Sequence, residues 1–92
     1  MTSIPKRLLG NILGKKIRIL YSNDPSLVGR EGIITYETRN MLEIEESSGK
    51  RILIPKHVCI FEIYFDEKTK ILVRGELLVN RLRKLIKLGR RR

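Results

Sequence analysis

The chain has 92 residues, of which 41% are hydrophobic, and this composition supports one compact domain but hardly two. Its uncharged apolar runs last only a few residues, far short of the roughly 20 that a membrane span requires. Neither a membrane protein nor a secreted one is indicated, so we expect a single cytoplasmic domain.

The single cysteine and the single histidine argue against two further classes of protein. Cys59 has no second cysteine for an internal disulfide, and with His57 alone it falls short of the three or four ligands that zinc takes. We therefore expect this chain to bind no metal or other cofactor. We interpret Cys59 as a small buried thiol.

The net charge of +10 is concentrated at the two ends of the chain. Residues 1–20 carry +5 and residues 74–92 carry +7, whereas residues 21–73 carry −2. A surface built only for solubility mixes charges of both signs. This segregation therefore indicates a polyanionic partner.

Residues 1–14 have the pattern of a short N-terminal helix. Ile4, Leu8 and Ile12 are spaced four apart, and Gly14 is expected to end the helix. A helix this short needs packing or a partner to be stable.

From residue 16 onward the apolar period changes to two, which indicates β-strands. Ile17, Ile19 and Tyr21 are expected to face the core from the first strand, and turn-forming residues separate it from the strands that follow. The penultimate strand is apolar on nearly both sides, so it is expected to lie inside the sheet. The six expected strands cover residues 16–21, 32–37, 41–46, 50–54, 58–65 and 70–74.

The third and fourth strands form a hairpin whose register follows from the sequence. A three-residue loop of Ser47, Ser48 and Gly49 places charge opposite charge and apolar opposite apolar, with Gly49 in the left-handed conformation. A two-residue loop would instead place Glu45 opposite Ile52. The acidic residues here are thus explained as the outer face of a hairpin. The expected partners are Glu46 with Lys50, Glu45 with Arg51, Ile44 with Ile52, and Leu42 with Ile54.

Residues 76–88 return to helical spacing and predict a basic amphipathic helix. Gly89 is expected to end it, with residues 89–92 forming a tail that is disordered unless bound. The fold class is therefore mainly β. It is a single domain in which residues 16–74 form a small closed or nearly closed six-stranded antiparallel barrel of the SH3, Sm or OB type, flanked by terminal helices. A closed barrel would leave no edge strands exposed.

The two expected helices carry more apolar surface than a small barrel easily covers. This predicts a protein interface formed by Leu8, Ile12, Leu78 and Leu82. The alternative, that both helices simply cap the ends of the barrel, stays open.

Two stretches carry the most specific pattern in the chain. The first begins at Ser22 and reads SNDPSLVGREGII, and the second begins at Glu37 and reads ETRNMLEI. Arg39 and Asn40 lie at the tip between two strands, where they could stabilise a turn or present donors to phosphates and base edges.

These stretches, together with Ile54-Pro55-Lys56 and Phe61, closely resemble ribonuclease P protein component 1 in its short archaeal-type form. The family commonly has Thr at the position of Met41, so this chain offers no hydroxyl there. The resemblance implies an Sm-like barrel that assists a catalytic RNA in removing 5′ leaders from precursor tRNA. It also implies that magnesium is bound with the RNA subunit, that a smaller zinc-ribbon protein subunit is a partner, and that this chain holds no catalytic residue of the endoribonuclease.

Recognition is expected to rest on charge and shape, because the five aromatic residues leave little room for base stacking. A ribosomal or translation-associated small β-barrel and an Sm-type ring are the alternative classes. The solution mass separates the ring from the monomer that we expect. The predicted RNA contacts are Lys15, Lys16, Arg18, Arg30, Arg39, Asn40, Lys56, Arg90, Arg91 and Arg92.

Overall fold

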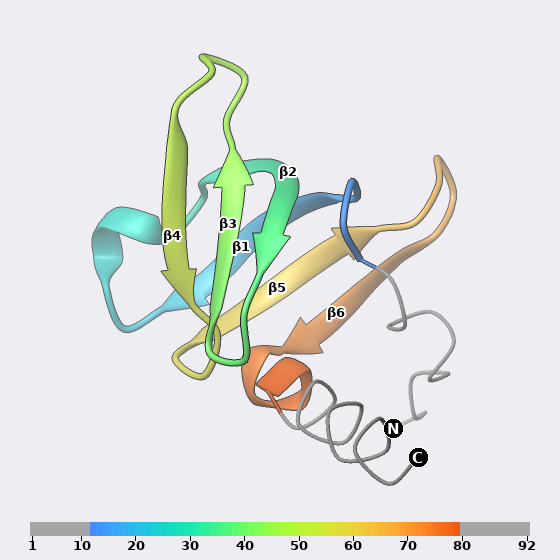
Figure 1. Cartoon of the computed structure of the whole chain (residues 1–92). Coiled ribbons are helices and arrows are strands. Elements are labelled where there is room, and N and C mark those ends of the chain that lie inside the picture. Colours follow the sequence, from blue (N-terminus) through green and yellow to red (C-terminus); the bar gives the residue numbers. More distant parts are fainter. Residues whose placement is uncertain (1–11, 80–92) are drawn as a thin grey trace, which may run out of the picture.

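The computed structural model describes residues 12–79, which form one antiparallel sheet of six strands followed by the start of a helix (Figure 1). All six expected strands are confirmed, and the helix begins at residue 75, one residue earlier than expected. No helix in this part of the chain is long and apolar enough to cross a membrane. The elements are β1 (Lys16–Ser22), the 3₁₀ helix η1 (Pro25–Leu27), β2 (Glu31–Glu37), β3 (Met41–Glu45), β4 (Arg51–Pro55), β5 (Cys59–Tyr64) and β6 (Lys70–Arg74).

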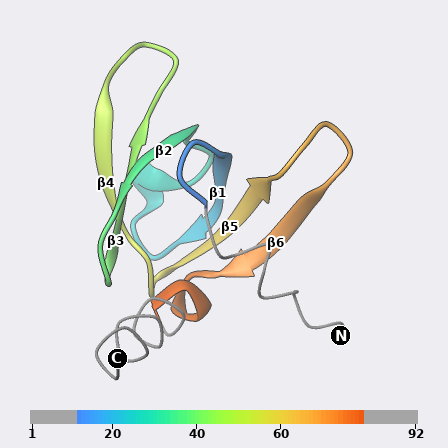
Figure 2. The ribbon, with the colours of Figure 1, turned by 45° about the vertical axis from the view of Figure 1, so that its right-hand side comes forward.

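The sheet is curved but open. Its strand order is β4-β3-β2-β1-β5-β6, so β4 and β6 are edges that do not pair with each other. Figure 2 shows β2, β3 and β4 on one side of β1, and β5 and β6 diverging from them on the other. Of the two forms expected, a closed or a nearly closed barrel, the closed one is therefore wrong. Both edge strands have only five residues, so few backbone groups are left unpaired without closure.

The core lies inside the curve of the sheet. Every strand contributes to it, and β1, β3 and β5 do so with alternate buried side chains, in keeping with the period of two. Phe61 on β5 is fully buried, and Phe65 just after β5 packs against the core from its margin. The buried core residues are Ile12, Ile17, Ile19, Ile34, Leu42, Ile44, Ile54, Cys59, Phe61, Ile63, Val73 and Leu78.

Strand β1 departs from its expected alternation near its end. The pairing of β1 with β5 shifts register between Ile19 and Tyr21, which leaves Leu20 and Tyr21 both exposed and Ser22 buried. One extra residue in a strand reverses the face of every residue after it. The expectation that Tyr21 faces the core is therefore wrong.

The β3–β4 hairpin has the expected register. Glu45 lies opposite Arg51, and the apolar residues of the two strands face each other as expected. Gly49 has φ +92°, in the left-handed region that favours glycine. The backbone N–H of Glu46 donates to the carbonyl of Lys50 at 2.8 Å, which closes the three-residue loop.

The expected N-terminal helix does not include Leu13 and Gly14, which form a turn. The amide of Lys15 donates to the carbonyl of Ile12 at 3.1 Å, and the amide of Gly14 donates to Ile34 on β2 at 2.8 Å. Residues 12–14 are thus a turn that is tied to the sheet. The rest of the expected helix lies outside the described residues, as do Leu8, Leu82 and the three terminal arginines.

Two of the four residues expected at a protein interface are core residues. Ile12 is 1% exposed and Leu78 is 0% exposed, and both belong to the core of the sheet. Assigning them to an interface was therefore wrong. The alternative, that both terminal helices cap the ends of a barrel, stays a prediction, because most of both expected helices lies outside residues 12–79.

Cys59 is buried as expected, and burial raises the pKa of its thiol. The thiolate is the species that reacts with alkylating agents, so both effects protect Cys59. We predict that iodoacetamide in mildly alkaline buffer modifies the folded protein at least about tenfold more slowly than the protein in concentrated guanidinium chloride. Mass spectrometry of both samples measures this, and equal rates would show that the thiol is accessible.

Candidate RNA interface

The turn between β2 and β3 presents Arg39 and Asn40, which are both exposed. Thr38 closes the turn twice: its backbone N–H donates to the carbonyl of Met41 at 3.0 Å, and its Oγ1 accepts from the Met41 amide at 3.1 Å. These bonds fix the backbone of the turn, and with it the points from which the two exposed side chains extend.

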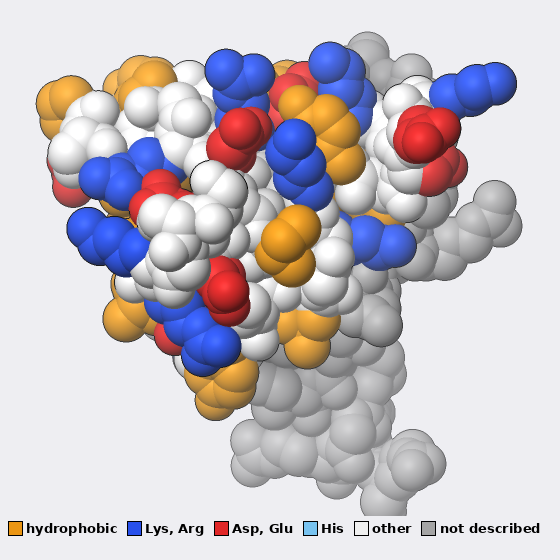
Figure 3. Space-filling model, turned by 90° about the horizontal axis from the view of Figure 1, so that it is seen from above, with side chains coloured by type: hydrophobic (Ala, Val, Ile, Leu, Met, Phe, Trp, Pro, Cys, Tyr) orange, Lys and Arg blue, Asp and Glu red, His pale blue; other side chains and the backbone are white. Residues whose placement is uncertain are grey.

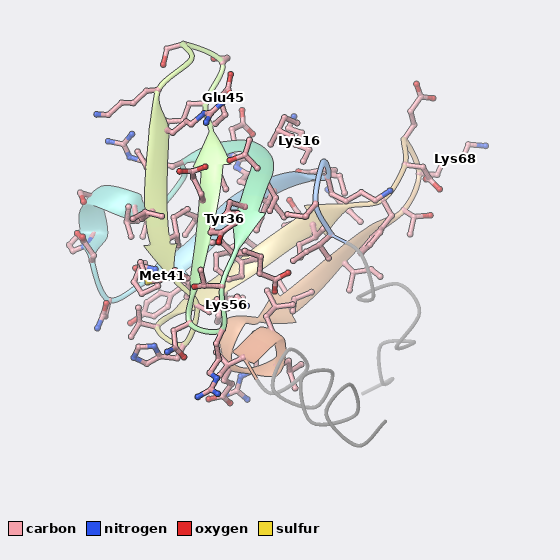
Figure 4. All side chains as sticks on the ribbon, in the orientation of Figure 1. Lys16, Tyr36, Met41, Glu45, Lys56 and Lys68 are labelled. Atoms are coloured by element: carbon pink, nitrogen blue, oxygen red, sulfur yellow. The ribbon has the colours of Figure 1, made fainter. Side chains whose placement is uncertain are left out.

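Lys56, which follows β4, forms hydrogen bonds that hold this turn in place. Its side chain is fully buried, and its Nζ donates to Oε2 of Glu37 and to the carbonyl of Thr38, both at 2.7 Å. Its backbone N–H donates to the carbonyl of Asn40 at 2.8 Å. Figure 4 shows Lys56 beside the β2–β3 turn, close to where the terminal helix begins.

Lys56 is therefore not an RNA contact, and that prediction was wrong. A lysine that follows a strand is normally exposed, because its ammonium group is almost never buried without a partner. The partners here are Glu37 and Thr38 of another hairpin. The stretch that begins at Glu37 and the stretch Ile54-Pro55-Lys56 both belong to the family pattern. That pattern alone did not indicate that Lys56 contacts Glu37 and Thr38.

Arg30 also has a structural role. Its Nη1 donates to both carboxylate oxygens of Glu46, at 2.9 and 3.1 Å, and its Nε donates to the carbonyl of Ser26 at 3.1 Å. The guanidinium thus joins the η1 loop to the end of the β3–β4 hairpin. An RNA contact by Arg30 stays a prediction, and it would have to compete with these bonds.

The Asp24 carboxylate organises the loop before Arg30. Its Oδ1 accepts from the backbone N–H of Ser26 at 3.0 Å and from the Ser26 hydroxyl at 2.8 Å. These hydrogen bonds to the charged form lower the pKa of Asp24. The first stretch of the family pattern therefore shapes a loop.

The basic residues at the start of β1 lie in a different part of the molecule. Figure 4 shows Lys16 well separated from Lys56. The Lys16 Nζ is 3.9 Å from the Glu31 carboxylate and 5.3 Å from the Tyr64 ring centre, while the Lys15 Nζ is 5.8 Å from the ring of Phe65. The predicted contacts are thus not gathered at one site.

Lys16 also borders an unfavourable environment for phosphate. It lines a hollow of about 520 Å³ together with the carboxylates of Glu31, Glu45 and Glu46. These carboxylates also pair with Lys16, Arg51 and Arg30, so a phosphate here would have to compete with them for the basic side chains. Of the predicted contacts in the described part of the chain, Arg39 and Asn40 are placed best.

Arg18 lies on the outer face of β1, opposite Glu62 of β5. The Tyr64 hydroxyl donates to Glu62 at 2.7 Å, and the Lys70 Nζ lies 3.5 Å from the same carboxylate. The Tyr64 hydrogen bond, with the charges of Lys70 and Arg18, lowers the pKa of Glu62. Arg18 therefore interacts electrostatically with the Glu62 carboxylate of the neighbouring strand.

The described body of the protein is almost neutral. Residues 12–79 contain eleven Lys and Arg and all ten Asp and Glu, so +9 of the net charge lies in residues 1–11 and 80–92. Six of those eleven basic side chains form ion pairs within this body. Figure 3 shows basic side chains interspersed with acidic and apolar ones on the face seen from above. Arg39 is one of the five basic side chains that form no ion pair with any residue from 12 to 79.

The comparisons with known proteins agree on one family. The family model described as ribonuclease P/MRP, subunit p29, matches residues 6–87. Ribonuclease P protein component 1 of Pyrococcus horikoshii is 49% identical over 71 residues, which cover 76% of this chain and 54% of that protein. The protein of the same name from Sulfurisphaera tokodaii is 43% identical over 74 residues, which cover 80% of this chain and 94% of that protein.

The solved structure of Mth11, a homologue of the human RNase P protein Rpp29, is also similar. It has a TM-score of 0.58 and 29% identity, and the match covers 71% of this chain and 83% of that one. The chain spans about half the length of the Pyrococcus relative and nearly all of the Sulfurisphaera relative. The sequence and the fold lead to the same assignment: this chain belongs to the ribonuclease P/MRP subunit p29 family.

Proposed function

We propose that this chain is an RNA-binding protein subunit of an archaeal-type, cytoplasmic ribonuclease P, in which it helps the catalytic RNA to remove 5′ leaders from precursor tRNA. The observation that carries the proposal is the family match over residues 6–87. The β2–β3 turn supports it, because two segments of the family pattern meet at Lys56 and fix the place of Arg39 and Asn40.

The chain acts in this proposal by positioning RNA. The basic residues outside the described body neutralise phosphates, which supplies affinity that falls steeply with salt. Arg39 adds a planar guanidinium that can bind a phosphate through two parallel hydrogen bonds, and the Asn40 amide can bond a base edge or a sugar. Because the turn is fixed beforehand, less conformational entropy is lost on binding.

The chemistry belongs to the partner molecules in this proposal. The RNA subunit and its magnesium cleave the precursor, and the zinc-ribbon protein subunit is the proposed protein partner. The isolated chain is proposed to be a monomer of 10.8 kDa. Light scattering alone and with the zinc-ribbon subunit tests both statements: a 1:1 complex is expected, and a much heavier particle formed by the chain alone would indicate a ring.

Reconstitution of precursor-tRNA cleavage tests the function directly. Adding the chain to the RNA subunit and the other protein subunits should raise the rate at moderate magnesium, because neutralised phosphates lower the amount of cation needed for the active RNA fold. The measurement is the initial rate over a magnesium series with and without the chain. An unchanged rate and an unchanged magnesium requirement would contradict the proposal.

The role of the turn is tested by comparing Arg39→Gln with Lys68→Gln. Both substitutions remove one exposed positive charge without an ion pair inside residues 12–79, and Figure 4 places Lys68 in the β5–β6 turn, far from Lys56. We predict that Arg39→Gln weakens binding to the RNA subunit about tenfold and lowers the salt slope by about 0.7–0.9, while Lys68→Gln changes little. Filter binding at several salt concentrations measures both, and equal effects would mean that only total charge matters.

A further inference from the structure

The bulge in β1 places Tyr21 at the rim of a hollow of about 270 Å³. Tyr21 is 57% exposed although it lies in a strand. Bulges are common next to binding sites, where they redirect a side chain. Without the register shift, Tyr21 would point to the core and the hollow would lose its tyrosine ring.

Three separate segments build this hollow. Asn23, just after β1, is joined to the start of β5 by a hydrogen bond from its backbone N–H to the Val58 carbonyl at 3.3 Å. Gly75 brings the end of β6 against the β4–β5 loop, since a Cβ at this position would overlap the carbonyl oxygen of Lys56. This close approach places Arg74 beside the same hollow.

The lining offers the chemistry that recognises a nucleobase. Tyr21 and the apolar Ile60 provide surfaces for the face of a ring. Asn23 carries a donor and an acceptor, and Glu76 carries acceptors, so these side chains match the edge of an unpaired base. Arg74, whose guanidinium lies 3.3 Å from the Glu76 carboxylate and is 70% exposed, can turn to a phosphate.

The hollow lies at the same end of the sheet as the β2–β3 turn. His57 lines it, and the preceding residue, Lys56, binds the carbonyl of Asn40 and holds the turn. An RNA strand bound to Arg39 would therefore pass close to this hollow. None of the predicted RNA contacts lines it.

We propose that this hollow accepts one unpaired nucleotide of RNA, with the base stacked on Tyr21 and its edge bonded by Asn23 and Glu76. The proposal rests on the RNA-binding function proposed above and adds to it a base-reading contact. If it is correct, base stacking contributes more to RNA affinity than the low content of aromatic residues indicates.

The test uses two labelled hairpin RNAs that differ in one base. One has a single bulged adenosine, and the other has an abasic ribose at the bulge, so both have the same number of phosphates. The full chain should bind the bulged-adenosine hairpin about tenfold more tightly in fluorescence anisotropy, as expected for one stacked base. Equal affinities of the wild-type chain for the two hairpins would overturn the proposal.

The matched variants are Tyr21→Leu and Tyr36→Leu. Tyr36 is 60% exposed on β2, so both variants remove an exposed tyrosine from a strand. Tyr21→Leu should abolish the preference for adenosine and leave affinity for the abasic hairpin unchanged, whereas Tyr36→Leu should keep the preference. A preference retained in Tyr21→Leu would overturn the assignment.

A second variant and a separate assay keep the outcome clear. Asn23→Ala should reduce the same preference severalfold, which gives a result even if Tyr21→Leu folds poorly. The cleavage assay distinguishes the two proposals: stimulated cleavage without a base preference overturns only the nucleotide site. A base preference without any stimulation of cleavage supports the nucleotide site and contradicts the ribonuclease P role.

Discussion

Lys56→Met should lower the free energy of unfolding by about 3–5 kcal/mol, the range seen when one partner of a buried ion pair is removed. The Glu37 carboxylate is only 11% exposed, and it would lose the Lys56 ammonium that lies 2.7 Å away. The carbonyl of Thr38 would lose a hydrogen bond in the same step. The loss would loosen the turn that carries Arg39.

Urea denaturation of the Lys56→Met chain and of a control, Lys70→Met, measures this effect. Lys70 pairs with Glu62 at 3.5 Å, but its side chain is 59% exposed, so its loss should cost at most about 1 kcal/mol. Adding Glu37→Gln to Lys56→Met should recover part of the loss, because the largely buried Glu37 carboxylate then no longer carries a charge. Similar stabilities for the Lys56 and Lys70 variants would show that the buried pair does not hold the structure.

Gly75→Ala should destabilise the protein by about 3 kcal/mol, the upper part of the range for overpacking. The added methyl group would overlap the carbonyl of Lys56 and would lie 3.0 Å from the carbonyl oxygen of Cys59. Both are backbone atoms, which cannot rotate away as the end of a side chain can. The start of the helix and the β4–β5 loop would have to separate, and the nucleotide hollow would change shape.

Gly14→Ala is the control for this substitution. Gly14 has φ +84° and open space around the position of a Cβ, so alanine there meets only backbone strain of about 1–2 kcal/mol. Thermal unfolding of both variants measures the difference. A Gly75 variant that is as stable as the Gly14 variant would mean that the helix start is not packed tightly against the loop.

Local patterns in the sequence determined much of the fold. The six strands follow from apolar residues at every second position, and the β3–β4 register follows from a loop that ends at Gly49. The burial of Cys59 and the membership of the family could also be predicted from the sequence, since both depend on short stretches of neighbouring residues. Within a hairpin, the partner of each residue is fixed by the loop between the strands.

Contacts between distant segments were decided only by the tertiary structure. Lys56 is buried because Glu37, 19 positions earlier, neutralises it, and no local pattern records that pairing. Tyr21 is exposed because β1 gains one extra residue against β5, a strand far along the chain. Ile12 and Leu78, which lie before the first strand and after the last, join one core with side chains from all six strands. The alternation of apolar residues and the length of a hairpin loop are set by residues close together in the sequence. The burial of a charged side chain, the face of a strand that a residue occupies and the closure of a sheet depend instead on which distant segments come into contact.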